Sequence, residues 1–229
     1  MKKQWNWKKI IGWVLFVALA GSIVFSAIKF FATPADAVIA KEGERLRSDY
    51  LLMLVQCTMG MVVMFLPSML ERRWNIGIPN YMYVMYFIFL FCAIYLGEVR
   101  NFYFIFPHWD TMLHGFSAAM LGALGFSLVS ILNDSERTSV HLSPLFVGLF
   151  AFCFALSVGA LWEIYEFSFD GLLGMNMQKF RLEDGTDLIG RAALSDTMKD
   201  IITDAIGALI VSVLGASTIR KKKEEQKAV

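Results

Sequence analysis

Acidic and histidine side chains border several long apolar runs of the chain, at spacings that suit a helix. Asp110 and His114 are four residues apart at the start of one such run. Glu163 and Glu166 are three residues apart near the end of the next run. Residues three or four apart project from the same face of an α-helix, so each pair presents its side chains together. Ionisable groups inside a membrane span are expensive, and by default they mark functional sites or paired structural ones.

A third group of acids begins the last apolar run. Asp196, Asp200 and Asp204 follow one another at intervals of four residues. Because an α-helix has about 3.6 residues per turn, this spacing lines the three carboxylates along one stripe. Consecutive membrane spans run in opposite directions, so these acids and the two earlier pairs are expected at a similar depth near one membrane face.

The acids outnumber the basic residues that are expected near them, which are Arg100, Arg181, Arg191 and Lys199. Closely placed carboxylates must be balanced by protons, by cations or by basic side chains. Oxygen ligands with one imidazole suit Mg²⁺, Mn²⁺ or Ca²⁺, and Zn²⁺ also fits. We therefore predict a divalent-metal site whose candidate ligands are Asp110, His114, Glu163, Asp196, Asp200 and Asp204.

A metal in such a site would activate a water molecule or polarise a phosphoryl or carbonyl oxygen. The candidate catalytic residues, which would act as ligands or as acid and base groups, are Asp110, His114, Glu163 and Asp200.

Structural roles compete with this interpretation. Asp196, with Ser195 beside it, is also placed to cap a helix. Asp110 and His114 could form a buried structural hydrogen-bonded pair. Glu166 and Asp170 are expected to face the outer water. Asp204 lies two turns into its predicted helix, so a solvated surface position does not explain it.

The composition indicates a membrane protein. Of the 229 residues, 57% are hydrophobic and 18% are charged, whereas soluble domains have about 45–50% and about 25%. The net charge of +1 gives no electrostatic basis for binding nucleic acid. Cys57, Cys92 and Cys153 lie inside apolar runs and lack the spacing of a zinc site or a disulfide framework.

Six segments are long and apolar enough to cross about 30 Å of hydrocarbon as helices. We predict an all-α polytopic membrane helix bundle, with 1–229 as one integral membrane domain. Residues 1–109 would supply three helices, 110–219 three helices with the polar site, and 220–229 a basic cytoplasmic tail. The predicted spans are Ile10–Phe31, Tyr50–Leu70, Tyr81–Gly97, Thr111–Leu132, Leu145–Phe167 and Thr197–Ile219.

The distribution of Lys and Arg predicts the orientation. Twelve lie on the side of the two termini and eight on the other side, and the richer side is usually cytoplasmic. This predicts a multi-pass protein of the bacterial inner membrane, with both termini in the cytoplasm and the acidic site at the outer face.

Ala35-Asp36-Ala37 resembles a signal-peptidase site, but the first apolar run is longer than the hydrophobic part of a signal peptide. We therefore expect an uncleaved first helix.

The acidic segments resemble a known family. Residues 110–116, 162–166, 196–200 and 204–208 are similar to those of the YjdF-like bacterial inner-membrane proteins and, more distantly, of the VanZ-like proteins. VanZ-like sequences show an Asp–His pair, a Glu, an Arg, and an Asp followed by Asn and Gly-Ala. Asp204 departs from that Asn. The resemblance implies a helical membrane protein and no particular reaction. The matching positions are Asp110, His114, Glu163, Arg191, Asp200, Asp204, Gly207 and Ala208.

Three functions fit these observations. The first is a metal-dependent enzyme acting on a lipid-linked or envelope substrate in the bilayer. The second is an ion or small-solute transporter, and the third is a noncatalytic protein whose polar groups form a structural network. Transporters commonly have repeated halves and a second polar gate. The chain shows no repeat, and its first three predicted spans hold almost no buried charge, which favours a one-sided site and therefore the enzyme.

Overall fold

The structure is a computed structural model that describes residues 6–34, 45–75, 77–133 and 142–227. Across these residues the chain is helical, and its only β-type pairing is an isolated bridge between Arg181 and Asp187. The possible cleavage site at residues 35–37 lies outside the described residues. The helical elements are α1 (Trp7–Ala32), α2 (Arg47–Val63), α3 (Leu66–Trp74), α4 (Asn80–Leu90), the π-helix η1 (Phe91–Val99), α5 (Phe102–Ile105), α6 (Trp109–Asn133), α7 (Pro144–Leu173) and α8 (Ser195–Lys227).

Six helical stretches in the described part are long and apolar enough to cross a membrane, which confirms the predicted all-α fold. Two of them are composite. The second span joins α2 to α3, and Pro67 lies in the first turn of α3, where its missing N–H is tolerated. The third span joins α4 to η1 and ends at Val99. This end is two residues beyond the predicted Gly97, so the span includes Glu98.

The chain divides into two compact units. Unit 1 comprises Met1–Asp110 and Phe169–Ala193, and unit 2 comprises Thr111–Ser168 and Leu194–Val229. The prediction of a single membrane domain stays a prediction.

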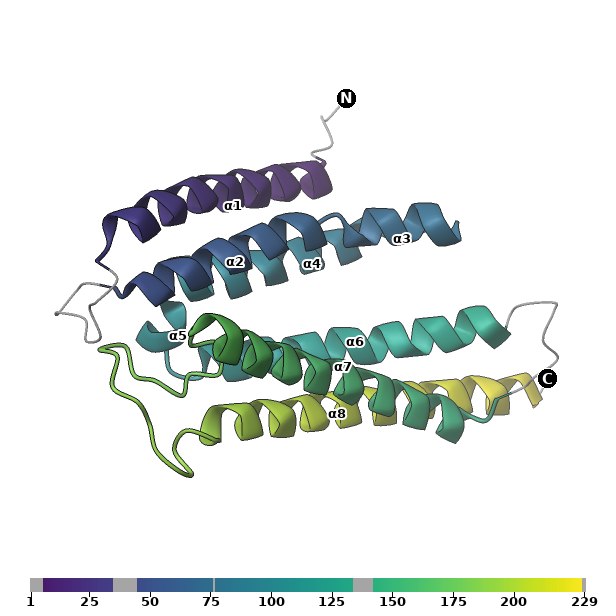
Figure 1. Cartoon of the computed structure of the whole chain (residues 1–229). Helices are drawn as coiled ribbons and strands as arrows, with labels where there is room; N and C mark the ends of the chain where they lie inside the picture. Colours follow the sequence, from purple (N-terminus) through teal and green to yellow (C-terminus); the bar gives the residue numbers. More distant parts are fainter. Residues whose placement is uncertain (1–5, 35–44, 76, 134–141, 228–229) are drawn as a thin grey trace. The chain divides into compact units, whose positions relative to one another are not determined.

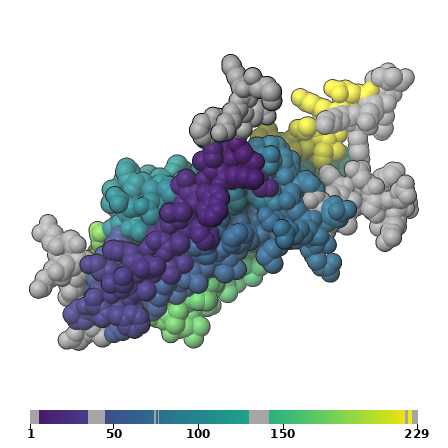
Figure 2. Space-filling model, turned by 90° about the horizontal axis from the view of Figure 1, so that it is seen from above, coloured from purple at the N-terminus to yellow at the C-terminus, as the bar shows by residue number. Residues whose placement is uncertain are grey.

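In unit 1, α1 packs against α2 and α4, as Figure 1 shows. The core between them is built from apolar side chains on all three helices. In Figure 2, α1 (purple) lies open on the viewed face. Large apolar side chains of α1, such as Trp13, Val17 and Ile28, are exposed. An exposed apolar helix face of this kind suits contact with lipid. The buried core residues are Leu15, Leu19, Cys57, Met64, Tyr83, Phe87, Leu90 and Ile94.

Unit 2 is a close-packed set of three helices, α6, α7 and α8 (Figure 1). Glycines bring their backbones together: a Cβ at Gly125 of α6 would lie 2.9 Å from the Cα of Ala151 in α7. A Cβ at Gly207 of α8 would lie 3.2 Å from the carbonyl oxygen of Gly115 in α6. Small residues at helix contacts are typical of membrane proteins, because dispersion replaces the hydrophobic effect there.

Asp170, near the end of α7, fixes the start of the segment between α7 and α8. Its buried carboxylate accepts hydrogen bonds from the backbone N–H groups of Met177 at 2.7 Å and Gln178 at 2.9 Å. The expectation that Asp170 faces the outer water is therefore wrong, because the returning chain covers it. Farther along, the backbone N–H of Thr186 donates to Asp184 and holds the pKa of that exposed carboxyl below its usual range.

Candidate metal centre

The first turns of α6 position Asp110 and His114. The two residues are one helical turn apart, so their side chains leave the same helix face. The boundary between the units falls directly after Asp110, but the helix itself fixes the placement of this residue relative to His114. His114 is buried and Asp110 is partly buried.

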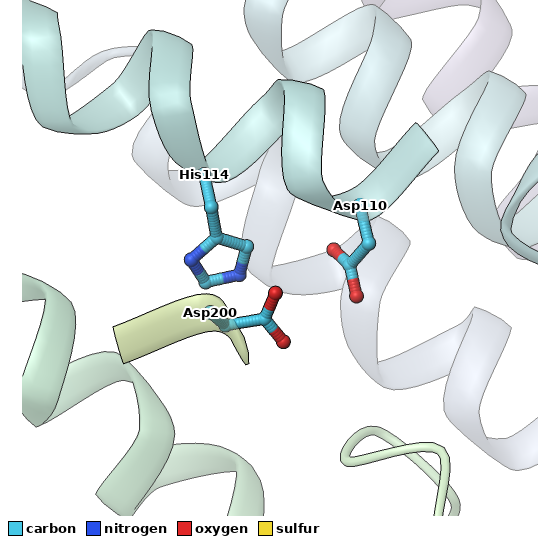
Figure 3. A group of neighbouring side chains, drawn as sticks. All are labelled: Asp110, His114 and Asp200. Atoms are coloured by element: carbon cyan, nitrogen blue, oxygen red, sulfur yellow. The ribbon is translucent and has the colours of Figure 1, made fainter. Parts of the chain in front are cut away.

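Asp200 brings a second carboxylate from α8. One ligand atom from each of Asp110, His114 and Asp200 lies within 4.8 Å of the other two, and the side chains converge on a common space (Figure 3). Two carboxylate oxygens and one imidazole nitrogen form a donor set that suits Mg²⁺, Mn²⁺ or Zn²⁺. These three residues could therefore supply part of a coordination sphere.

Two further acids flank the imidazole of His114. Its Nδ1 atom lies 3.3 Å from Oδ1 of Asp204 in α8, and its Nε2 atom lies 3.9 Å from Oε1 of Glu163 in α7. A carboxylate beside one ring nitrogen favours the proton there and leaves the other nitrogen free to act as a ligand or a base. Asp204 is thus placed to orient His114.

Gly159 makes room for the Asp204 carboxylate. A Cβ at this position of α7 would lie 2.9 Å from Cγ of Asp204 and closer still to Oδ2. Among the described residues, Oδ2 of Asp204 is buried and has no hydrogen-bond partner. The glycine therefore allows an acidic side chain to enter a tightly packed contact between two helices.

In the part of the chain that the structure describes, the buried acids of this cluster outnumber the buried basic groups. Glu163, Asp200 and Asp204 are all buried carboxylates, and His114 is the basic group next to them. In the described ranges no Lys or Arg side chain belongs to the buried class. Several buried carboxylates near one imidazole require protons or a cation, since leaving each ionised in a low-dielectric site costs several kcal/mol, about 2.5–3.5 on insertion scales.

The remaining candidate residues lie in other environments. Asp196 is partly buried in the first turn of α8, and it is not part of the group whose ligand atoms lie within 4.8 Å of one another. Glu166 accepts a hydrogen bond from the indole N–H of Trp162 at 2.9 Å. Arg191 and Lys199, two of the basic residues that the sequence places near the acids, are exposed. The structure thus brings together Asp110, His114, Glu163, Asp200 and Asp204.

The third span carries a largely buried charge that the predicted span, which ends at Gly97, leaves out. Glu98, in the last turn of η1, forms an ion pair with Lys179 at 3.3 Å, and their side chains are only 13% and 14% exposed. The sequence feature that could have identified Glu98 is its position as an acidic residue directly after an apolar run. Nothing in the sequence indicates that a lysine about eighty residues later reaches it, because the contact depends on the fold of the segment after α7.

Six spans and a buried acidic cluster define the class of the protein, an all-α polytopic membrane protein. The chain belongs to the family described as "Predicted membrane protein (DUF2238)", whose profile matches residues 11–221. This is the YjdF-like family, so that resemblance is confirmed, while the similarity to VanZ-like proteins stays a prediction.

One relative is an uncharacterised protein of Thermotoga maritima, which is 28% identical to this chain over 144 residues. The match covers 62% of this chain and 66% of the relative, slightly less than two thirds of the relative's length. No solved structure matches the chain.

Proposed function

We propose that the protein binds a divalent cation, Mg²⁺, Mn²⁺, Ca²⁺ or Zn²⁺, between α6 and α8. On this proposal the protein uses the ion in enzymatic chemistry on a lipid-linked or envelope substrate. The observation that carries the proposal is the charge imbalance: three buried carboxylates surround or adjoin one imidazole. A bound cation balances them without the cost of protonating each acid. The ligands are Asp110, His114 and Asp200, which come close to one another.

The other acids have separate roles in this proposal. Asp204 accepts the Nδ1 proton of His114, which orients the ring and makes its second nitrogen a better ligand. Glu163 lies on the Nε2 side of the ring and serves as general base toward a water molecule. The cation would polarise a phosphoryl or carbonyl oxygen of the substrate. A polyprenyl pyrophosphate is a suitable first substrate to test, because such lipids place phosphates at a membrane face.

The thermal stability of the purified protein in detergent tests metal binding. An ion at about one hundred times its dissociation constant adds about 2.7 kcal/mol to the stability of the folded state. The melting temperature should therefore rise with the correct ion and fall with EDTA. The shift should largely disappear in His114→Ala and Asp200→Ala.

Asp196→Asn is a matched control, because it removes a carboxylate one turn away on the same helix and should keep the response. Identical melting curves with every ion and with EDTA would instead support protonated carboxylates and would contradict the proposal.

A cation or proton transporter is the second candidate function. It is favoured by the placement of acids along α8, where Asp196, Asp200 and Asp204 occupy successive turns. By helix geometry Asp204 lies about 12 Å farther along the axis than Asp196. Proteoliposomes that contain a metal-quenched dye distinguish the two functions. Mn²⁺ entry that depends on the protein and on Asp204 would establish transport, whereas metal-dependent turnover of the substrate without entry would establish the enzyme.

We propose that both termini are cytoplasmic, in a bacterial inner membrane, and that the cluster lies near the outer face. The excess of Lys and Arg on the side of the termini supports this. A fluorescent reporter that folds only in the cytoplasm, fused after Val229, should be bright. A dark fusion together with an active periplasmic reporter at the same position would contradict this orientation.

A further inference from the structure

Unit 1 contains a small cavity with a mixed polar and apolar lining at one end of its membrane spans. Its volume is about 30 Å³, and it lies where α2 begins, where η1 ends and where the segment 176–183 returns. The second span begins at Arg47 and the third ends at Val99. The cavity is therefore at the depth where lipid head groups meet the hydrocarbon.

Part of the cavity lining is apolar. Leu46, Leu52 and Met53 line it and are buried, and Phe104 lines it as well. Such a surface suits the methylene groups of a ligand and does not suit a fully hydrated ion.

The rest of the lining carries charges of both signs in equal number. The acids are Asp49, Glu98 and Glu183, and the bases are Arg45, Lys179 and Arg181. A cavity whose lining has no net formal charge disfavours a ligand with a large net charge. It matches a ligand that carries one positive and one negative group.

The charged side chains are fixed in place by the fold. The guanidinium of Arg45 donates to the carbonyl oxygens of Glu98 and Val99, both at 3.2 Å, and so caps the end of η1. Lys179 bonds to Glu98 and has a backbone φ of 49°, in the left-handed region that lysine rarely adopts. A π-helical segment and a strained residue often occur where a side chain must be placed for function.

We propose that this cavity binds a head group that joins a phosphate ester to a primary ammonium, as in a phosphoethanolamine lipid. The ammonium enters the cavity and donates to Asp49 and Glu98. The phosphate stays at the opening and accepts from Arg45 and from Arg181, whose side chain is one quarter exposed and also pairs with Asp187 through its Nε at 2.8 Å. The site lies in unit 1 and does not depend on the proposed metal centre.

The size of the cavity selects among head groups. A cavity of about 30 Å³ has room for the equivalent of about two water molecules. A primary ammonium fits this space and has N–H donors for the carboxylates. A trimethylated choline group is wider and has no N–H donor, and a phosphoglycerol group has no positive charge.

Delipidated protein in mixed micelles tests the proposal, with native mass spectrometry and thermal melting as readouts. Dioleoyl phosphatidylethanolamine at about ten times its dissociation constant should raise the melting temperature by about 3–5 °C. The phosphatidylcholine and phosphatidylglycerol of the same chains should raise it by about 1 °C or less. A water-soluble glycerophosphoethanolamine with an equal effect would assign the same chemistry to a free zwitterion instead of a lipid.

Variants of the lining complete the test. Asp49→Asn and Arg181→Gln should each remove the preference for phosphatidylethanolamine, and Arg181→Gln changes a partly exposed side chain that need not disturb folding. Asp184→Asn alters an exposed acid of the same segment that does not line the cavity, and it should keep the preference. Equal stabilisation by the three lipids, or a preference that survives both lining variants, would overturn the proposal.

Discussion

The two polar clusters of the protein differ in how their charges are balanced. In unit 1 the largely buried carboxylate of Glu98 faces the ammonium of Lys179, and the surrounding cavity has three acids and three bases. In unit 2 the carboxylates of Glu163 and Asp204 share the single imidazole of His114, and Asp200 adds a further negative charge. Among the described residues, the lining acids and bases of unit 1 are equal in number, whereas the buried acids of unit 2 outnumber its buried basic groups.

This difference indicates what each cluster can bind. A site with equal numbers of acidic and basic groups gains little from a simple ion, because its own charges offset one another. It can accept a ligand that has both signs. An acidic site with one imidazole gains from any cation that replaces protons on its carboxylates. The metal proposal therefore concerns unit 2, and the head-group proposal concerns unit 1.

The largest expected effect on stability comes from removing one member of the Glu98–Lys179 ion pair. Lys179→Met leaves the Glu98 carboxylate buried without its cation, and removing one partner of a buried pair costs about 3–5 kcal/mol. We expect a strong fall of the melting temperature in detergent. The double variant Glu98→Gln/Lys179→Met removes both charges and should recover most of the loss. A double variant as unstable as Lys179→Met would show that the ion pair is not the cause.

A second effect comes from the packing that admits Asp204. Gly159→Ala places a Cβ against the Asp204 carboxylate, and overpacking of this kind costs about 1–3 kcal/mol. The matched control is Gly171→Ala in the same helix, where an added Cβ meets nothing within 4 Å. That control should be neutral or slightly stabilising, because alanine favours a helix. Equal melting temperatures for the two variants would contradict the tight α7–α8 contact.

A smaller effect is expected when the unbalanced cluster loses one charge. Without metal, Asp204→Asn should raise the stability by about 1 kcal/mol, because it removes one of several like charges and keeps an acceptor for His114. The same variant should weaken metal binding by about 10–100-fold, as the loss of an orienting partner does. Metal titrations followed by melting measure both quantities. A loss of stability in the metal-free variant would identify a structural pair instead.

Much of the fold is predictable from the sequence because the physical signal is strong. Runs of apolar residues as long as a bilayer is thick specify spans, and the six predicted spans are confirmed. The convergence of His114 with Asp204 and Glu163 also follows from helical spacing and shared depth. The helix period fixes which side chains share a face, and alternation of the spans fixes their level.

The parts that could not be predicted depend on irregular backbone. Asp170 resembles a solvated acid at a helix end, but it is buried because the chain reverses and donates two N–H groups to it. Glu98 and Lys179 are distant in sequence, and their pairing depends on a left-handed residue in a long connection. Periodicity carries no information about such segments. The role of Gly159 was also not anticipated, because the requirement for a glycine there comes from a neighbouring helix.

The central claim is that the acidic cluster of unit 2 holds a divalent cation, and the metal content of the purified protein tests it most directly. Protein purified in detergent, equilibrated with Mg²⁺, Mn²⁺, Ca²⁺ and Zn²⁺ and then desalted, should retain a stoichiometric amount of one of them in elemental analysis. Asp200→Ala, treated in parallel, should retain about one tenth or less, because it loses a charged ligand. A wild-type protein that retains no metal, or an Asp200→Ala variant that retains the same amount, would contradict the account.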